Sequence, residues 1–91
     1  MSVSKYEAFA RVVELGSLTR AAESLGCTQS AVSHTISALE AELGFPVLTR
    51  SRAGVKLTGD GERVLPAVRG VLNSQERLSQ IASAIRGLDS G

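Results

Sequence analysis

The sequence has almost none of the residues that usually build metal sites or activate nucleophiles. Its 91 residues include one cysteine, Cys27, and one histidine, His34. A single cysteine excludes an internal disulfide, and this pair leaves a structural zinc site short of ligands. No acid in the sequence is placed to orient His34 as a base for Cys27. We therefore expect no enzyme activity, no bound metal and no cofactor.

Aromatic residues and long apolar runs are also scarce. Tyr6, Phe9 and Phe45 are the only aromatic residues, so the stacking platform of folds that bind RNA or single strands is missing. A membrane-spanning helix needs roughly 20 apolar residues, and no run here approaches that length. Met1 is not followed by a basic segment and an apolar stretch. We expect a cytoplasmic protein with no membrane partner, and any nucleic-acid partner should be double-stranded DNA.

What the sequence does contain is an ordinary globular composition with an uneven distribution of charge. Hydrophobic residues make up 43% and charged residues 21%, which is typical of one folded domain at this length. The net charge of +1 is too small to indicate nucleic-acid binding by itself. However, residues 44–57 contain Arg50, Arg52 and Lys56 and no acid. This local basic patch favours an anionic partner.

Three segments end on a leucine followed by a glycine, which is a common end of a helix because glycine accepts a left-handed backbone. They predict helices over about residues 4–15, 18–25 and 29–43, with Ser4 and Thr28 as candidate N-caps. The short turn at residues 26–28 between the last two helices suggests a helix-turn-helix. Apolar residues at helical spacing predict the buried faces, which are Tyr6, Phe9, Ala10 and Val13, then Leu18, Ala21, Ala22 and Leu25, then Val32, Ile36, Leu39 and Leu43.

The third helix has a small, polar and uncharged face opposite its apolar stripe. A helix that enters the major groove needs short side chains that donate and accept hydrogen bonds at base edges. An ordinary solvated face would be the alternative, but such faces are usually rich in Lys and Glu, and this face has neither before Glu40. The candidates for base contacts are Gln29, Ser30, Ser33, His34 and Ser37, with Thr35 ranked lower because it lies nearer the apolar stripe.

Two β-prone runs, residues 47–50 and 55–57, predict a hairpin wing. Its cations, Arg50, Arg52 and Lys56, are candidates for phosphate contacts, although charge on an edge hairpin also protects against aggregation. The free amides and polar side chains at the starts of the second and third helices are further candidates for binding a phosphate. These residues are Ser17, Thr19, Arg20 and Thr28. Ser17 is equally well explained as a helix cap.

A long amphipathic helix is predicted after the wing, from a cap at Thr58 to about Ile85. A small domain cannot cover an apolar stripe of that length, although packing on its own core accounts for the first two turns. We expect this helix to form a homodimer through Val64, Val68, Val71, Leu72, Leu78, Ile81 and Ile85. The predicted organisation is a DNA-binding domain at residues 1–58, a dimerisation helix at 59–87 and a frayed end at 88–91.

Several stretches resemble the DNA-binding domain of LysR-type transcriptional regulators. They are residues 16–25 (GSLTRAAESL), 28–33 (TQSAVS), 39–44 (LEAELG), 47–50 (VLTR) and 55–61 (VKLTGDG). The resemblance implies a mainly α fold, a winged helix-turn-helix of three helices and a two-stranded wing, followed by a linker helix. It also implies a dimer with antiparallel linker helices that binds dyad-symmetric operators, usually AT-rich around a T-N11-A pattern.

Full members of that family carry an effector domain, and this chain ends where it would begin, so we expect no small-molecule ligand for it. Several positions depart from the common pattern. Ser30 stands where proline is frequent, His34 where arginine is frequent and Thr35 where glutamine is common. In the wing, position 53 is usually an arginine, whereas this chain has Arg52 followed by Ala53. These differences bear on the operator sequence. The rival hypothesis is a helical interaction module that dimerises and binds no nucleic acid.

Overall fold

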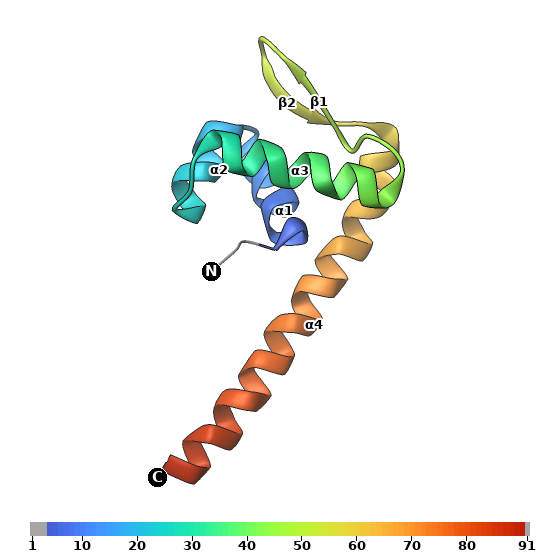
Figure 1. Ribbon diagram of the computed structural model, residues 1–91. Helices are drawn as coiled ribbons and strands as arrows, with labels where there is room; N and C mark the ends of the chain where they lie inside the picture. Colours follow the sequence, from blue (N-terminus) through green and yellow to red (C-terminus); the bar gives the residue numbers. More distant parts are fainter. Residues whose placement is uncertain (1–3, 91) are drawn as a thin grey trace.

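The computed structural model describes residues 4–90, with residues 88–90 described by their backbone alone. Three helices form a compact head, a two-stranded hairpin stands beside them, and a long helix leads away from the head (Figure 1). This confirms the predicted mainly α winged helix-turn-helix with a long final helix. The elements are α1 (Lys5–Leu15), α2 (Leu18–Leu25), α3 (Gln29–Leu43), β1 (Leu48–Ser51), β2 (Gly54–Leu57) and α4 (Gly59–Ser90).

Each of the first three helices begins at a hydroxyl side chain and ends at a left-handed glycine. The hydroxyl oxygen accepts a hydrogen bond from a backbone N–H of the first turn, which has no partner within the helix. The caps are Ser4, Ser17 and Thr28, and the glycines are Gly16, Gly26 and Gly44, with φ of 67°, 71° and 90°. The three predicted leucine-glycine ends are therefore confirmed.

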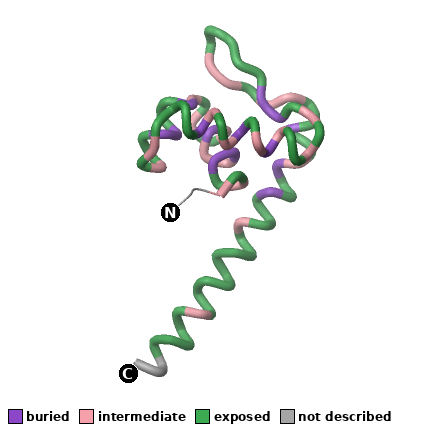
Figure 2. The backbone as a smooth tube through the Cα atoms, in the orientation of Figure 1, coloured by how far each residue is buried: buried purple, intermediate pink, exposed green. Residues whose placement is uncertain are grey.

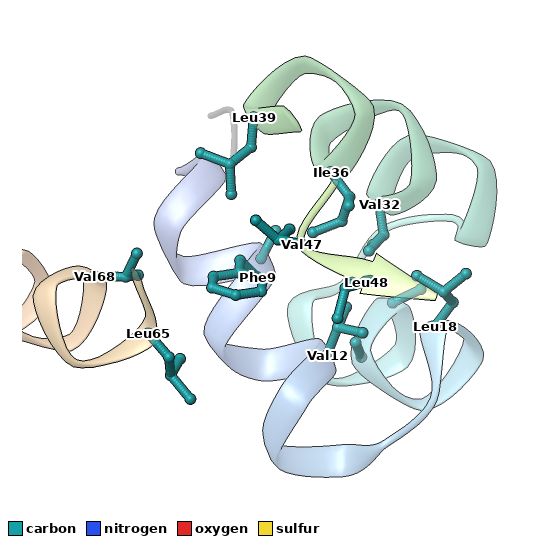
Figure 3. Close-up of a cluster of buried hydrophobic side chains, with 13 residues drawn as sticks. Phe9, Val12, Leu18, Val32, Ile36, Leu39, Val47, Leu48, Leu65 and Val68 are labelled. Atoms are coloured by element: carbon teal, nitrogen blue, oxygen red, sulfur yellow. The ribbon is translucent and has the colours of Figure 1, made fainter. Parts of the chain in front are cut away.

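The core lies where α1, α2, α3 and the first turns of α4 meet (Figure 3). Phe9, Val12 and Leu39 are fully buried in it. The predicted buried face of α1 was only partly right, because α1 buries Ala8, Phe9 and Val12 while Tyr6, Ala10 and Val13 are half-buried. Helix α1 contacts α2, α3, α4 and β2. A helix surrounded in this way does not bury a single stripe.

The wing is an antiparallel hairpin with a two-residue turn at Arg52 and Ala53. Leu48 pairs with Leu57, and Ser51 pairs with Gly54. The first strand begins at Leu48, one residue later than predicted. The backbone N–H of Val47 bonds to the side chain of Glu40, and its carbonyl bonds to the N–H of Thr58. Gly54 has φ of 120°, and a Cβ added at this position would lie 3.1 Å from the carbonyl oxygen of Gly16. The base of the wing therefore rests against the turn between α1 and α2.

The peptide groups of Val47 join α3, the wing and α4. The carboxylate of Glu40 on α3 accepts hydrogen bonds from the backbone N–H of Val47 at 2.7 Å and of Leu48 at 3.3 Å. The carbonyl of Val47 accepts the N–H of Thr58 at 3.0 Å. Thr58 also caps α4, since its hydroxyl oxygen accepts the N–H of Gly61 at 2.9 Å. These contacts fix the wing and α4 relative to α3.

Helix α4 rests on the head only through its first turns. Leu65 and Val68 are buried in the core, and beyond Leu72 almost every residue is exposed (Figure 2). The helix runs to Ser90, past its predicted end near Ile85, and the molecule measures 53 × 26 × 20 Å. Residue 91 lies outside the described residues, and the fraying of residues 88–91 stays a prediction. No helix within residues 4–90 has the length and apolarity to cross a membrane.

Gly61→Ala should destabilise the fold, because its added Cβ would overlap the backbone carbonyl oxygen of Val47. We expect a loss of about 1 to 3 kcal/mol in the free energy of unfolding, measured by urea denaturation with circular dichroism. The matched control is Gly59→Ala, two residues earlier in the same helix, where the Cβ meets nothing within 4 Å. The control should be neutral or more stable by up to about 1 kcal/mol. Equal effects of the two changes would contradict the proposed close contact.

Candidate nucleic-acid interface

The structure brings five of the six predicted base-contacting residues together on one face of α3. Thr28 holds the start of this helix by accepting a hydrogen bond from the N–H of Ala31 at 3.1 Å. A shallow hollow on the face is lined by Gln29, Ser30, Ser33, His34 and Ser37. All are exposed except Ser33, which is half-buried. The face is polar, open to solvent and without formal charge while His34 is neutral.

Thr35 lies apart from this group, as its lower rank anticipated. It is half-buried, and its hydroxyl donates to the carbonyl of Ala31, one turn earlier, at 2.9 Å. A hydroxyl that is bound to its own helix has no hydrogen to donate to another acceptor. Thr35 therefore contributes little to the exposed face.

The start of α2 lies against the start of α3. The hydroxyl of Thr19 donates to the side-chain oxygen of Gln29 at 3.4 Å, and Thr19 and Arg20 are exposed. Ser17 accepts a hydrogen bond from the N–H of Arg20 at 3.2 Å. The structure thus gives Ser17 a capping role, which was one of its two predicted roles. Of the predicted phosphate-binding side chains here, Thr19 and Arg20 are the more accessible.

A second hollow, of about 260 Å³, lies where the start of α2, the start of α3 and the wing meet. Its lining includes Ser17 and Thr19 from α2, Gln29 from α3, and Arg50 and Val55 from the wing. Three segments that are separate in the sequence therefore share one concave surface. The polar face of α3 is continuous with it, because Gln29 lines both hollows.

The three cations of the wing are all exposed, but they are held differently. Arg50 on β1 reaches α3, where its guanidinium donates to the hydroxyl oxygen of Ser33 at 2.7 Å. Arg52 lies in the turn of the wing, and Lys56 on β2 pairs with Thr49. The ion pair found within residues 4–90 joins Lys5 to Glu42 at 2.8 Å. The wing cations thus have no carboxylate partner in the described chain.

Glu40 is the residue that sequence reasoning missed. In the sequence it marks only the end of the acid-free face of α3, whereas in the structure its carboxylate accepts hydrogen bonds from two backbone N–H groups at the entry to the wing. A signal was available, since Glu40 lies four residues after Ile36 and next to Leu39, beside the buried stripe of α3. An acid at the margin of a core generally has hydrogen-bond partners. The sequence does not say which groups these are.

The expected dimer surface on α4 divides into two parts. Val68 is 6% exposed and belongs to the core of its own head, which corrects its assignment to the dimer interface. Val64 and Leu72 are half-buried against the same core. The remaining predicted positions are large apolar side chains on the open helix, 41% to 67% exposed. We call these the linker stripe, which consists of Val71, Leu78, Ile81 and Ile85.

Residues 3–62 match the family described as "Bacterial regulatory helix-turn-helix protein, lysR family". The chain belongs to the LysR family. Over its whole length this LysR-family chain is 41% identical to the transcriptional regulator YvbU of Bacillus subtilis and 37% identical to the transcriptional regulator IlvR of Caulobacter vibrioides. It spans 32% and 31% of the length of those two proteins. The family and these relatives are transcriptional regulators and not enzymes.

Two solved structures of LysR-family DNA-binding domains in complex with DNA resemble the chain closely. The CbnR domain has a TM-score of 0.81 and 32% identity, covering 89% of this chain and 93% of its own. The BenM domain, solved with the catB site 1 DNA, has a TM-score of 0.84 and 30% identity, covering 93% of this chain and 96% of its own. The LysR winged-helix fold with its long C-terminal helix is therefore shared.

Proposed function

We propose that this chain is the DNA-binding domain of a LysR-type transcriptional regulator and that it binds double-stranded DNA sequence-specifically in the cytoplasm. The main support is the concave surface formed by α2, α3 and the wing. This surface joins an uncharged polar helix face to exposed cations that have no carboxylate partner in the described chain. The likeness to two domains that were solved on DNA supports the same function.

The proposed division of roles follows from reach and charge. Helix α3 enters the major groove, and Gln29, Ser30, Ser33, His34 and Ser37 contact base edges, with Thr35 in a minor role. Phosphates need donors and positive charge but carry no sequence information. For these contacts we propose Arg52 and Lys56 of the wing together with the starts of α2 and α3, where the residues are Ser17, Thr19, Arg20 and Thr28.

We also propose that two copies associate through the linker stripe. Its four side chains are more than two-fifths exposed and lie on a helix that is almost wholly exposed beyond Leu72. A second helix packed along the stripe removes this apolar surface from water. Two heads held at a fixed separation would then bind two half-sites related by a dyad. A spacing near 10 base pairs or a multiple follows from the helical repeat of DNA.

The rival hypothesis is a dimeric interaction module that binds no nucleic acid. A mobility shift with random duplex DNA at low salt separates the two, because phosphate contacts give at least weak binding to any sequence. The operator then comes from selection out of a random duplex pool. A chain that is folded and dimeric but gives no shift at low salt would support the rival.

Arg52→Ala should weaken binding to the selected operator and to random DNA alike, and should lower the salt-dependence slope by about one phosphate contact. Arg69→Ala removes the same charge from an exposed position on α4 and is the control.

Gln29→Ala should instead cost roughly 1 to 3 kcal/mol on the operator and little on random DNA. Fluorescence anisotropy titrations at several salt concentrations measure both. Equal losses of Gln29→Ala on the two DNAs would contradict a base contact.

Leu78→Asp should make the protein monomeric without unfolding it, because it places an unpaired charge in the middle of the linker stripe and outside the core. Gln80→Asp adds the same charge two residues away on the opposite side of α4 and should leave the dimer intact. Sedimentation equilibrium measures the association.

Leu78→Asp should also bind a single half-site as well as the parent. It should lose the gain that the parent obtains from two correctly spaced half-sites, because that gain comes from linkage. A parent that sediments as a monomer at high micromolar concentration would overturn the role of the linker stripe.

A further inference from the structure

The two arginines of the wing differ in what they contact. The guanidinium of Arg50 donates to the hydroxyl oxygen of Ser33 at 2.7 Å, so it lies over the polar face of α3. Arg52, in the turn of the wing, makes no such bond to α3 and has no ion-pair partner among residues 4–90. Position in the sequence suggests the same phosphate-binding role for both. Their geometry does not.

We infer that Arg50 is a positioning residue that makes the Ser33 hydroxyl a hydrogen-bond donor toward a base edge of the DNA. This inference rests on the proposed DNA-binding function. It assigns to a wing residue an effect on sequence recognition that passes through α3. The contact partner on the DNA is an acceptor atom in the major groove, such as purine N7, guanine O6 or thymine O4.

The donor role follows from the chemistry of the two side chains. A guanidinium has five N–H donors and no acceptor, so in this contact the oxygen of Ser33 must accept. The positive charge of Arg50 also turns the hydroxyl hydrogen away from itself. The hydroxyl hydrogen of Ser33 has no acceptor in the described part of the chain. Because Ser33 lines the exposed face of α3, that hydrogen is available to an acceptor on DNA.

Without Arg50 the same hydroxyl has a competing partner within its own helix. A serine or threonine inside a helix commonly donates to the carbonyl one turn earlier. Thr35 does so here, with Ala31 at 2.9 Å. We expect Ser33 to turn in the same way toward the carbonyl of Gln29 when Arg50 is removed. The DNA contact would then be lost even though Ser33 is still present.

A double-mutant cycle on the selected operator tests this coupling. Arg50→Ala and Ser33→Ala should each weaken binding by about tenfold, within the range of one base contact. The double variant should be no weaker than the weaker single variant, because both changes remove the same contact. The control cycle pairs Arg52→Ala with Ser33→Ala, and its losses should multiply. Multiplicative losses in the Arg50 cycle would overturn the inference.

Two further readouts separate positioning from a direct phosphate contact of Arg50. Arg50→Ala should leave the salt-dependence slope unchanged, whereas Arg52→Ala lowers it by about one contact. Selection from random DNA with Arg50→Ala and with Ser33→Ala should lose base preference at the same position of each half-site. A lower slope for Arg50→Ala, or an unchanged selected sequence for both variants, assigns the contact to phosphate and overturns the inference.

The conservative variant and the parent complete the test. Ser33→Thr keeps a hydroxyl at this position and should retain most of the operator affinity, provided that Arg50 is present. Equal thermal melting of all variants excludes unfolding as the cause of weaker binding. If the parent binds no DNA at low salt, the proposed function fails and this inference fails with it. If the parent binds but the Arg50 cycle is multiplicative, the inference fails alone.

Discussion

The hydrogen bonds around the peptide groups of Val47 determine how α3, the wing and α4 are arranged relative to one another. The Glu40 carboxylate accepts a hydrogen bond from the backbone N–H of Val47, and the backbone N–H of Thr58 donates to the carbonyl of Val47. Because that carbonyl faces the first turn of α4, a side chain at Gly61 would overlap it. Helix α3, the wing and α4 therefore share one anchor. Residues with no contact to DNA in our proposal thus fix the groups of α3 and of the wing that do contact it relative to one another.

One consequence is that the candidate interface is composite. Gln29 of α3 lies beside Thr19 of α2, and Ser33 of α3 is bound by Arg50 of the wing. Two of the side chains with a proposed role at base edges are thus oriented by neighbours from other elements, and these neighbours restrict their rotamers before any DNA is present. Replacing α3 alone with the helix of a relative would not transfer a binding preference unless Thr19 and Arg50 were retained.

The sequence predicted those features that depend on neighbours along the chain. Caps such as Ser4 and Thr28 and stops such as Gly26 act within one helical turn, so their residue types were sufficient. The partners of Glu40 and Arg50 lie seven and seventeen residues away, and no local pattern encodes them. The apolar repeat of α4 predicts that another surface packs on its apolar stripe. It does not tell whether that surface is the chain's own core, as for Val68, or a second molecule.

The linker helix also acts as a lever. Its last firm contact with the head is near Leu72, and Ile85 lies about 20 Å farther along the axis at 1.5 Å per residue. Gly61, at the Val47 anchor, lies about 36 Å from Ile85 along the axis, so a tilt of about 5° there would move Ile85 by about 3 Å, which is close to the rise of one DNA base pair. In a dimer joined at that end, small angular changes at the anchor would change the separation of the two heads by a whole base-pair step. In such a dimer, packing at Gly61 would influence which half-site spacing the assembly accepts, from a position remote from both DNA and partner.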